Sequence, residues 1–248
     1  MRQAKRAVLF DLDGTLIHSL PDLTSAVNHI LAEEGRDAVT EAEVGPMVGD
    51  GAHTLMERAF AARGGMPAVG AAAVLSRFLA FYEANATTLT RPFPHVAETL
   101  ARLKDKGLVL AVCTNKPTAA THEILQALEL DHYFAVVVGG DDTPALKPSP
   151  VHVDTVLDRL GVARDEAVMV GDSVNDVLAA KGAQVPCIVV TFGYSRTPVS
   201  EPGRRSGGGR LPPHRRRGGR TGLIKLRYLP IRLSPTPIIS SFCRHGRA

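Results

Sequence analysis

Two aspartates separated by one residue follow a short apolar segment near the N-terminus. Residues 8–10 are Val-Leu-Phe, and Asp11, Leu12 and Asp13 come directly after them. Side chains alternate along an extended chain, so Asp11 and Asp13 are expected on one side, beyond the end of a buried strand. Two carboxylates this close repel each other and favour a hard cation, most readily Mg²⁺. The pair also suits phosphoryl transfer through an aspartyl phosphate, with an acidic turn as the alternative for this motif alone.

Further polar side chains follow two later apolar segments and occupy the loop between them. They are Thr114, Asn115, Lys147, Asp172 and Asp176. Ligands of open α/β sheets bind outside the carboxyl ends of the strands, so these groups are expected to meet Asp11 and Asp13. A nucleophile, acids for Mg²⁺ and donors for phosphoryl oxygens are what phosphoryl transfer needs. The combination therefore predicts a phosphoryl-transfer site.

Strand-like and helix-like segments alternate over most of the chain. Strands are expected at 7–10, 108–113, 135–138, 167–170 and 187–191, with helices at 95–106, 117–128, 153–160 and 173–181. Such alternation predicts an α/β fold with a doubly wound parallel sheet. Residues 17–85 interrupt this alternation, because their pattern predicts helices only.

The expected site residues form four motifs: Asp11 with Asp13, Thr114 with Asn115, Lys147, and Asp172 with Asp176. The motifs occur in the order typical of the haloacid dehalogenase superfamily of phosphohydrolases, which the chain resembles over residues 6–194. The resemblance implies that Asp11 is the nucleophile that becomes phosphorylated. It implies that Asp13 is the general acid/base, with its backbone carbonyl on Mg²⁺. Thr114 and Lys147 would bind the phosphoryl oxygens. The dehalogenase branch lacks the second acid, so Asp13 favours phosphatase or mutase chemistry.

The same resemblance implies a domain organisation and a metal shell. Residues 1–16 and 86–200 would form a Rossmann-like catalytic core, and residues 17–85 an inserted all-helical cap that excludes water when it closes. Asp172 would bind Mg²⁺ together with Asp11. Asp176 would be a supporting acid that orients the metal shell or Lys147.

Within the superfamily, the chain is most similar to bacterial phosphoglycolate phosphatases. The cues are Val48-Gly49-Asp50-Gly51, Cys113-Thr114-Asn115-Lys116-Pro117, Gly139-Gly140-Asp141-Asp142-Thr143 and Phe192-Gly193-Tyr194. Gly49 and Gly51 allow backbone N–H groups to approach a small carboxylate, or they form a simple turn between helices. Asn115 borders the phosphate site and is expected to bind substrate. Two interpretations, a substrate contact and a solvated position, stay open for four further residues: His18, His53, Arg58 and Lys116.

The expected activity is hydrolysis of a small phosphorylated metabolite, 2-phosphoglycolate in the first place, with Mg²⁺. Three alternatives stay open: a phosphatase for sugar phosphates, nucleotides or pyrophosphate, a hexose-phosphate mutase, and a non-enzymatic nucleic-acid binder acting through a basic tail. The chain has no apolar run of membrane-spanning length and no signal-peptide pattern, and its three cysteines are widely spaced. A cytoplasmic monomer or homodimer, with neither nucleic acid nor membrane as partner, is the expectation.

Residues 201–248 differ in kind from the rest of the chain. They contain twelve lysine and arginine residues and one acid, Glu201, and their first half is rich in Gly, Pro and Arg. A disordered linker and a basic arm for nucleic acid or membrane are two interpretations. We favour a third, a shifted reading frame. Deleting one base within the Pro202 codon permits a sequence that reads as a loop, a strand and an acidic turn.

Overall fold

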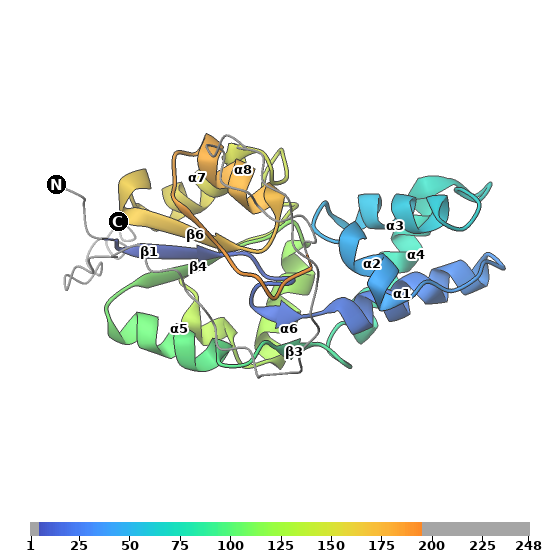
Figure 1. Cartoon of the computed structure of the whole chain (residues 1–248), viewed down its shortest axis with the longest axis horizontal. Helices are drawn as coiled ribbons and strands as arrows, with labels where there is room; N and C mark the ends of the chain where they lie inside the picture. The colour runs from blue at the N-terminus through green and yellow to red at the C-terminus, as the bar shows by residue number, and fades with distance from the viewer. Residues whose placement is uncertain (1–4, 195–248) are drawn as a thin grey trace, which may run out of the picture.

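The computed structural model describes residues 5–194, and the predictions for the basic tail lie outside this range. Its centre is a parallel sheet of five strands in the order β5-β4-β1-β6-β7 (Figure 1). The strands are β1 (Ala7–Phe10), β4 (Val109–Cys113), β5 (Val136–Val138), β6 (Ala167–Gly171) and β7 (Cys187–Val189). The α/β doubly wound fold predicted from the sequence is confirmed.

The direction of winding reverses at β1. The chain passes from β1 to β4 and β5 on one side of it, and then crosses to β6 and β7 on the other. Phe10 at the end of β1 lies in register with Val112 of β4 and Val170 of β6. Ligand sites in open α/β sheets form where the strand order reverses, outside the carboxyl ends. Asp11 is the first residue beyond β1 at this point.

Helices cover both faces of the sheet, and alternate residues of β1 serve the two faces. Val8 and Phe10 belong to a buried cluster shared with α5 and α6, whereas Ala7 and Leu9 pack with α7 and α8. These helices are α5 (Val96–Asp105), α6 (Thr118–Ala127), α7 (Pro150–Leu160) and α8 (Val174–Gly182). Strands buried on both faces explain the continuous apolar runs of the sequence.

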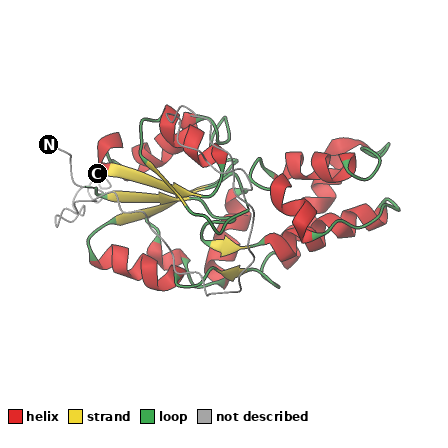
Figure 2. Cartoon of the chain, in the orientation of Figure 1, coloured by secondary structure: helices red, strands yellow, loops and turns green. Residues whose placement is uncertain are grey.

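The other helices form a group at one end of the sheet, which we call the helical lobe (Figure 2). It consists of α1 (Leu20–Glu33), α2 (Glu41–Val44), α3 (Ala52–Ala61) and α4 (Gly70–Asn85). Short 3₁₀ helices occur at Gly45–Met47, Asp131–Tyr133 and Arg164–Glu166. The apolar face of α1 is buried, with Leu23, Val27 and Ile30 each at most 5% exposed. Within residues 5–194, no helix combines the length and apolar character that crossing a membrane requires.

The expectation that residues 17–85 contain helices only is wrong at its start. β2 (Ile17–His18) pairs antiparallel with β3 (Arg91–Pro92), where the chain enters and leaves the helical lobe. The Asp22 carboxylate accepts hydrogen bonds from the backbone N–H groups of the returning chain at Leu89 (3.0 Å) and Thr90 (2.8 Å). A two-residue strand is too short to show an alternating pattern in the sequence. It is recognised only by its pairing with the other short strand in the tertiary structure.

Candidate active site

Asp11 lies at the carboxyl end of β1, with its backbone fixed by the neighbouring strand. Its N–H donates to the carbonyl oxygen of Val170 on β6 at 2.9 Å. The residue is 8% exposed, and its Oδ1 accepts from Lys147 Nζ at 2.8 Å. The sheet thus presents one buried carboxylate at its reversal point, held against an ammonium group.

Lys147 Nζ has three acceptors, which match its three N–H donors. They are Asp11 Oδ1 (2.8 Å), the Cys113 carbonyl oxygen (2.7 Å) and Asp176 Oδ1 (2.6 Å). Burial disfavours the ammonium, but the attraction of Asp11 and Asp176 outweighs it and raises the pKa of Lys147 above its usual value. Lys147 is therefore charged and immobilised at the base of the site.

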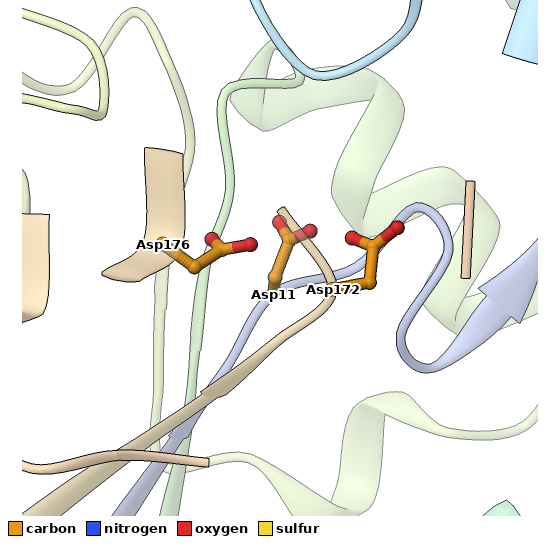
Figure 3. A group of neighbouring side chains, drawn as sticks. All are labelled: Asp11, Asp172 and Asp176. Atoms are coloured by element: carbon orange, nitrogen blue, oxygen red, sulfur yellow. The ribbon is translucent and has the colours of Figure 1, made fainter. Parts of the chain in front are cut away.

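Three buried carboxylates lie close together, and two of them, Asp11 and Asp176, contact this ammonium. In Figure 3, Asp11 lies between Asp176 and Asp172. One oxygen from each of the three lies within 4.8 Å of the others. Burial raises the pKa of Asp11 to about 8, with Asp176 and Asp172 acting in the same direction and Lys147 opposing them. Three acids facing one ammonium give an excess of negative charge that a cation would offset.

The outer two acids are anchored by backbone and hydroxyl donors. Asp176 Oδ2 accepts from Ser173 N (3.0 Å) and Oγ (2.7 Å), and Asp172 Oδ2 accepts from Tyr194 N at 2.7 Å. Gly14 lies against Asp172 with φ +84°, and a Cβ there would come within 2.5 Å of its Oδ2. Position 14 therefore requires glycine for two reasons: the backbone is in a left-handed conformation, and it approaches the Asp172 carboxylate closely.

The Asp13 carboxylate points to a different part of the site. Ser19 Oγ donates to its Oδ1 at 2.5 Å, and Lys116 Nζ lies 3.2 Å from its Oδ2. Lys116 also donates to the Tyr82 hydroxyl of α4 at 2.8 Å, although it is only 7% exposed. Burial lowers the pKa of Lys116, but Asp13 and Tyr82 outweigh burial and raise it above the usual value. Asp13 thus sits in a second ion pair, which reaches into the helical lobe.

The loop of Gly49 and Asp50 in the helical lobe is bonded to two asparagines of the sheet region. Asn115 Nδ2 donates to the Gly49 carbonyl oxygen at 2.8 Å. Asn175 Nδ2 donates to Asp50 Oδ1 at 2.5 Å and to the same Gly49 oxygen at 3.2 Å. The two parts of the molecule are therefore joined by hydrogen bonds between these residues.

A small cavity of about 60 Å³ lies between the sheet and the helical lobe. Its sheet side carries the expected polar groups Asp11, Asp13, Thr114, Asn115 and Lys147, together with Lys116, which the sequence had left open. Gly49, Gly51 and apolar side chains of α1, α3 and α4 line the opposite side. The cavity has room for a small polar ligand whose charged end faces the strand ends.

The comparison with known proteins agrees with this geometry. The family model for haloacid dehalogenase-like hydrolase matches residues 8–190, which include all four motifs. The chain belongs to the haloacid dehalogenase-like hydrolases. It is 46% identical to phosphoglycolate phosphatase of Rhodospirillum rubrum over 203 residues, which are 80% of this chain and 84% of that protein. The corresponding protein of Caulobacter vibrioides is 45% identical, covering 77% of this chain and 81% of its own length.

A solved structure from the same family has the same fold. The predicted phosphoglycolate phosphatase of Haemophilus somnus superposes with a TM-score of 0.74 at 34% identity, covering 78% of this chain and 88% of that one. Together these relatives show that the chain is a phosphoric monoester hydrolase similar to phosphoglycolate phosphatases.

In this haloacid dehalogenase-like hydrolase, the predicted site residues converge. Asp172 and Asp176 join the cavity-lining groups through their contacts with Asp11 and Lys147. Two residues left open by the sequence lie elsewhere. His53 pairs with Glu57 on the exposed side of α3, and Arg58 pairs with Asp50 at 2.5 Å. Neither of them lines the cavity.

Three contributors to the site were not expected from the sequence. Ser19 and Tyr82 contact the Asp13–Lys116 pair, and the Tyr194 hydroxyl accepts from the N–H of Ser19 at 2.7 Å. Phe192-Gly193-Tyr194 was a recognisable motif, so Tyr194 carried a usable signal. Tyr82 did not, because its place four residues after Phe78 reads as an ordinary apolar stripe.

Proposed function

We propose that the protein is a Mg²⁺-dependent phosphatase that hydrolyses 2-phosphoglycolate to glycolate and phosphate through an aspartyl-phosphate intermediate. The observation that carries this proposal is the position of Asp11. Its carboxylate lies at the reversal point of the sheet, between an ammonium and a second acid, and faces the cavity. Its neighbour Asp13 is turned toward the helical lobe, where a leaving group would lie.

The donor set fits Mg²⁺. Hard divalent cations prefer carboxylate and carbonyl oxygens, and we propose that Asp11, Asp172 and the backbone carbonyl of Asp13 hold the ion. Both oxygens of Asp176 are engaged by Lys147 and Ser173, so Asp176 supports the shell and does not join it. Bound Mg²⁺ would neutralise the phosphoryl group and hold it against Asp11.

In the first step, the Asp11 carboxylate attacks phosphorus, and the bond from phosphorus to the ester oxygen breaks. Asp13 donates a proton to the departing oxygen, which leaves as the alcohol. Ser19 Oγ and Lys116 hold the Asp13 carboxyl in place for this transfer. Thr114 Oγ1 accepts from Lys116 N at 3.2 Å, so its own proton is available for a phosphoryl oxygen.

In the second step, a water molecule attacks the aspartyl phosphate. Asp13, now a carboxylate, takes a proton from this water, phosphate departs, and Asp11 is regenerated. We propose that the helical lobe acts as the cap for both steps. Its bonds to Asn115 and Asn175 close the cavity, which keeps bulk water away until substrate is bound.

Two observations support 2-phosphoglycolate as the substrate. Relatives at 45–46% identity are phosphoglycolate phosphatases, and the cavity of about 60 Å³ favours a small ester. A second candidate is a sugar phosphate. A structure of CbbY from Rhodobacter sphaeroides in complex with xylulose-1,5-bisphosphate superposes with a TM-score of 0.67, at 28% identity over 77% of this chain and 88% of that one.

Phosphate release from a panel of phosphorylated compounds with Mg²⁺ tests the proposal. The panel contains 2-phosphoglycolate, hexose phosphates, pentose bisphosphates, nucleoside monophosphates, pyrophosphate and p-nitrophenyl phosphate. We expect the highest kcat/KM for 2-phosphoglycolate, and a higher value for any other physiological ester would replace it as the substrate. Asp11→Asn should reduce turnover by several orders of magnitude, while the exposed control Asp37→Asn keeps full activity. Activity of Asp11→Asn above about a tenth of wild type would contradict the covalent mechanism.

A further inference from the structure

The cavity is lined by two ammonium groups, and only one of them has a donor to spare. Lys147 uses its three N–H donors on Asp11, Asp176 and a backbone carbonyl, beside the attacking carboxylate. Among the described residues, Lys116 Nζ meets only Asp13 Oδ2 at 3.2 Å and the Tyr82 hydroxyl at 2.8 Å. Buried donors are normally all satisfied, so the remaining N–H calls for an acceptor inside the cavity.

Tyr82 adds a second donor next to this ammonium. Its hydroxyl accepts from Lys116, and across residues 5–194 its own proton meets no acceptor. Burial raises the pKa of Tyr82, so the phenol stays protonated and able to donate. Tyr82 is 3% exposed, and its ring stacks on Phe78 with centroids 5.7 Å apart. Its position is therefore fixed by the packing of α4.

We propose that Lys116 and Tyr82 form the binding site for the carboxylate of the substrate. The ammonium N–H and the phenol O–H would each donate to one carboxylate oxygen. This inference rests on the proposed function, because it assumes a substrate with an acid group next to the ester. Under this proposal, one residue of the sheet region and one of the helical lobe together select substrates that carry an acid group.

The distances suit a two-carbon acid. In 2-phosphoglycolate, the carboxylate oxygens lie three bonds from the ester oxygen, which corresponds to about 2.6 to 3.6 Å at ordinary bond lengths. Lys116 Nζ is 3.2 Å from Oδ2 of Asp13, the residue that would protonate this ester oxygen. A substrate whose ester oxygen contacts Asp13 therefore has Lys116 within reach of its carboxylate.

The cavity side chains near Lys116 and Tyr82 explain why a substrate with a charged end is favoured. Leu23, Leu55 and Leu79 line the cavity from α1, α3 and α4. Apolar side chains offer no hydrogen bonds to the hydroxyl groups of a sugar, and a polar group left without partners loses binding energy. Within the described part of the chain, Glu83 is the one charged side chain that the helical lobe adds to the cavity lining, so Lys116 and Tyr82 are the donors available to an acid at this end.

The test compares two nearly isosteric substrates, 2-phosphoglycolate and its neutral amide, 2-phosphoglycolamide. We expect wild type to prefer the acid. Lys116→Met should lower kcat/KM for the acid about 10- to 100-fold more than for the amide, mainly through KM, since the contact exists before and during the reaction. Tyr82→Phe should reduce the same preference by a smaller factor. Lys106→Met, which removes an exposed lysine after α5, is the matched control and should behave as wild type.

The outcomes separate the two proposals. If wild type prefers the acid and both Lys116→Met and Tyr82→Phe keep that preference, the carboxylate site is wrong and the proposed function stands. If wild type hydrolyses p-nitrophenyl phosphate but not 2-phosphoglycolate, the proposed function fails and this inference fails with it. If Lys116→Met does not fold, Tyr82→Phe decides, because it removes one donor and keeps the packed ring. An unchanged acid preference in that variant would then overturn the site.

Discussion

The side-chain amide of Asn115 is bonded to both backbone groups of Lys147. Its Oδ1 accepts from Lys147 N at 2.8 Å, and its Nδ2 donates to Lys147 O at 2.8 Å. The same Nδ2 donates to the Gly49 carbonyl oxygen of the helical lobe. Both N–H donors of the amide are therefore engaged, and Asn115 positions Lys147 and links it to the lobe.

Asn115→Ala should therefore lower kcat by about 10- to 100-fold, because Lys147 loses its backbone support at the nucleophile. Steady-state kinetics with p-nitrophenyl phosphate and with 2-phosphoglycolate measure this loss. Asn28 is a matched control, since it holds both backbone groups of Val39 in the same way within the helical lobe. Asn28→Ala should lower the melting temperature and leave kcat close to wild type. Equal kinetic losses in the two variants would show that Asn115 has a general structural role only.

Asp13→Asn should slow esters with poor leaving groups more than activated esters. An alkoxide needs a proton as it departs, whereas p-nitrophenolate leaves without one. We expect the rate of aspartyl-phosphate formation to fall at least tenfold more for 2-phosphoglycolate than for p-nitrophenyl phosphate. Rapid-quench measurements of the first turnover give both rates. The same loss for the two esters would remove Asp13 from the role of general acid.

Removal of Mg²⁺ with EDTA should abolish turnover, and Mg²⁺ or Mn²⁺ should restore it. Ca²⁺ should substitute poorly, because it prefers a larger and less regular shell. Asp172→Asn keeps an acceptor for Tyr194 N but removes one charge from the site. This variant should need at least tenfold more Mg²⁺ for half-maximal activity and should lose most of the rise in melting temperature that Mg²⁺ causes. The exposed control Asp105→Asn should match wild type in both measurements, and a normal Mg²⁺ response of Asp172→Asn would contradict its place in the metal shell.

His152 on α7 should make stability depend on pH in a defined window. Its ring is fully buried, and burial, reinforced by the charge of Lys147, lowers its pKa from 6.5 to about 4. Between these values the unfolded chain binds a proton that the folded protein excludes. The free energy of unfolding therefore falls as the pH drops from about 6.5 to 4, by roughly 3 kcal/mol at most from this residue.

The measurement for His152 is urea unfolding of wild type and His152→Gln between pH 4 and 8. The difference between the two curves should shrink as the pH falls through this window, because glutamine does not titrate. His53→Gln removes an exposed histidine that pairs with Glu57 and should run parallel to wild type. A constant difference between wild type and His152→Gln would show that His152 binds its proton equally in both states.

The sequence determined the order of strands and helices and the residues that end the strands. Both are local properties: apolar runs that form buried strands stop where Asp11, Thr114 and Asp172 begin. Parallel strands bring their carboxyl ends to one edge of the sheet, so convergence of these groups follows from the alternation alone. The doubly wound sheet and the family could be predicted for the same reason.

Only the tertiary structure decided what surrounds Asp13 and Lys116. Tyr82 lies 34 positions before Lys116 along the chain, and its place among the apolar residues of α4 predicts packing and not a hydroxyl contact. Lys116 equally has no pattern that separates a buried ammonium from a solvated one. Contacts between distant elements depend on how the helical lobe docks on the sheet, and side chains on both must meet before such a site exists. The β2–β3 pair and the hydrogen bond from Asn115 to Gly49 could not be predicted from the sequence for the same physical reason.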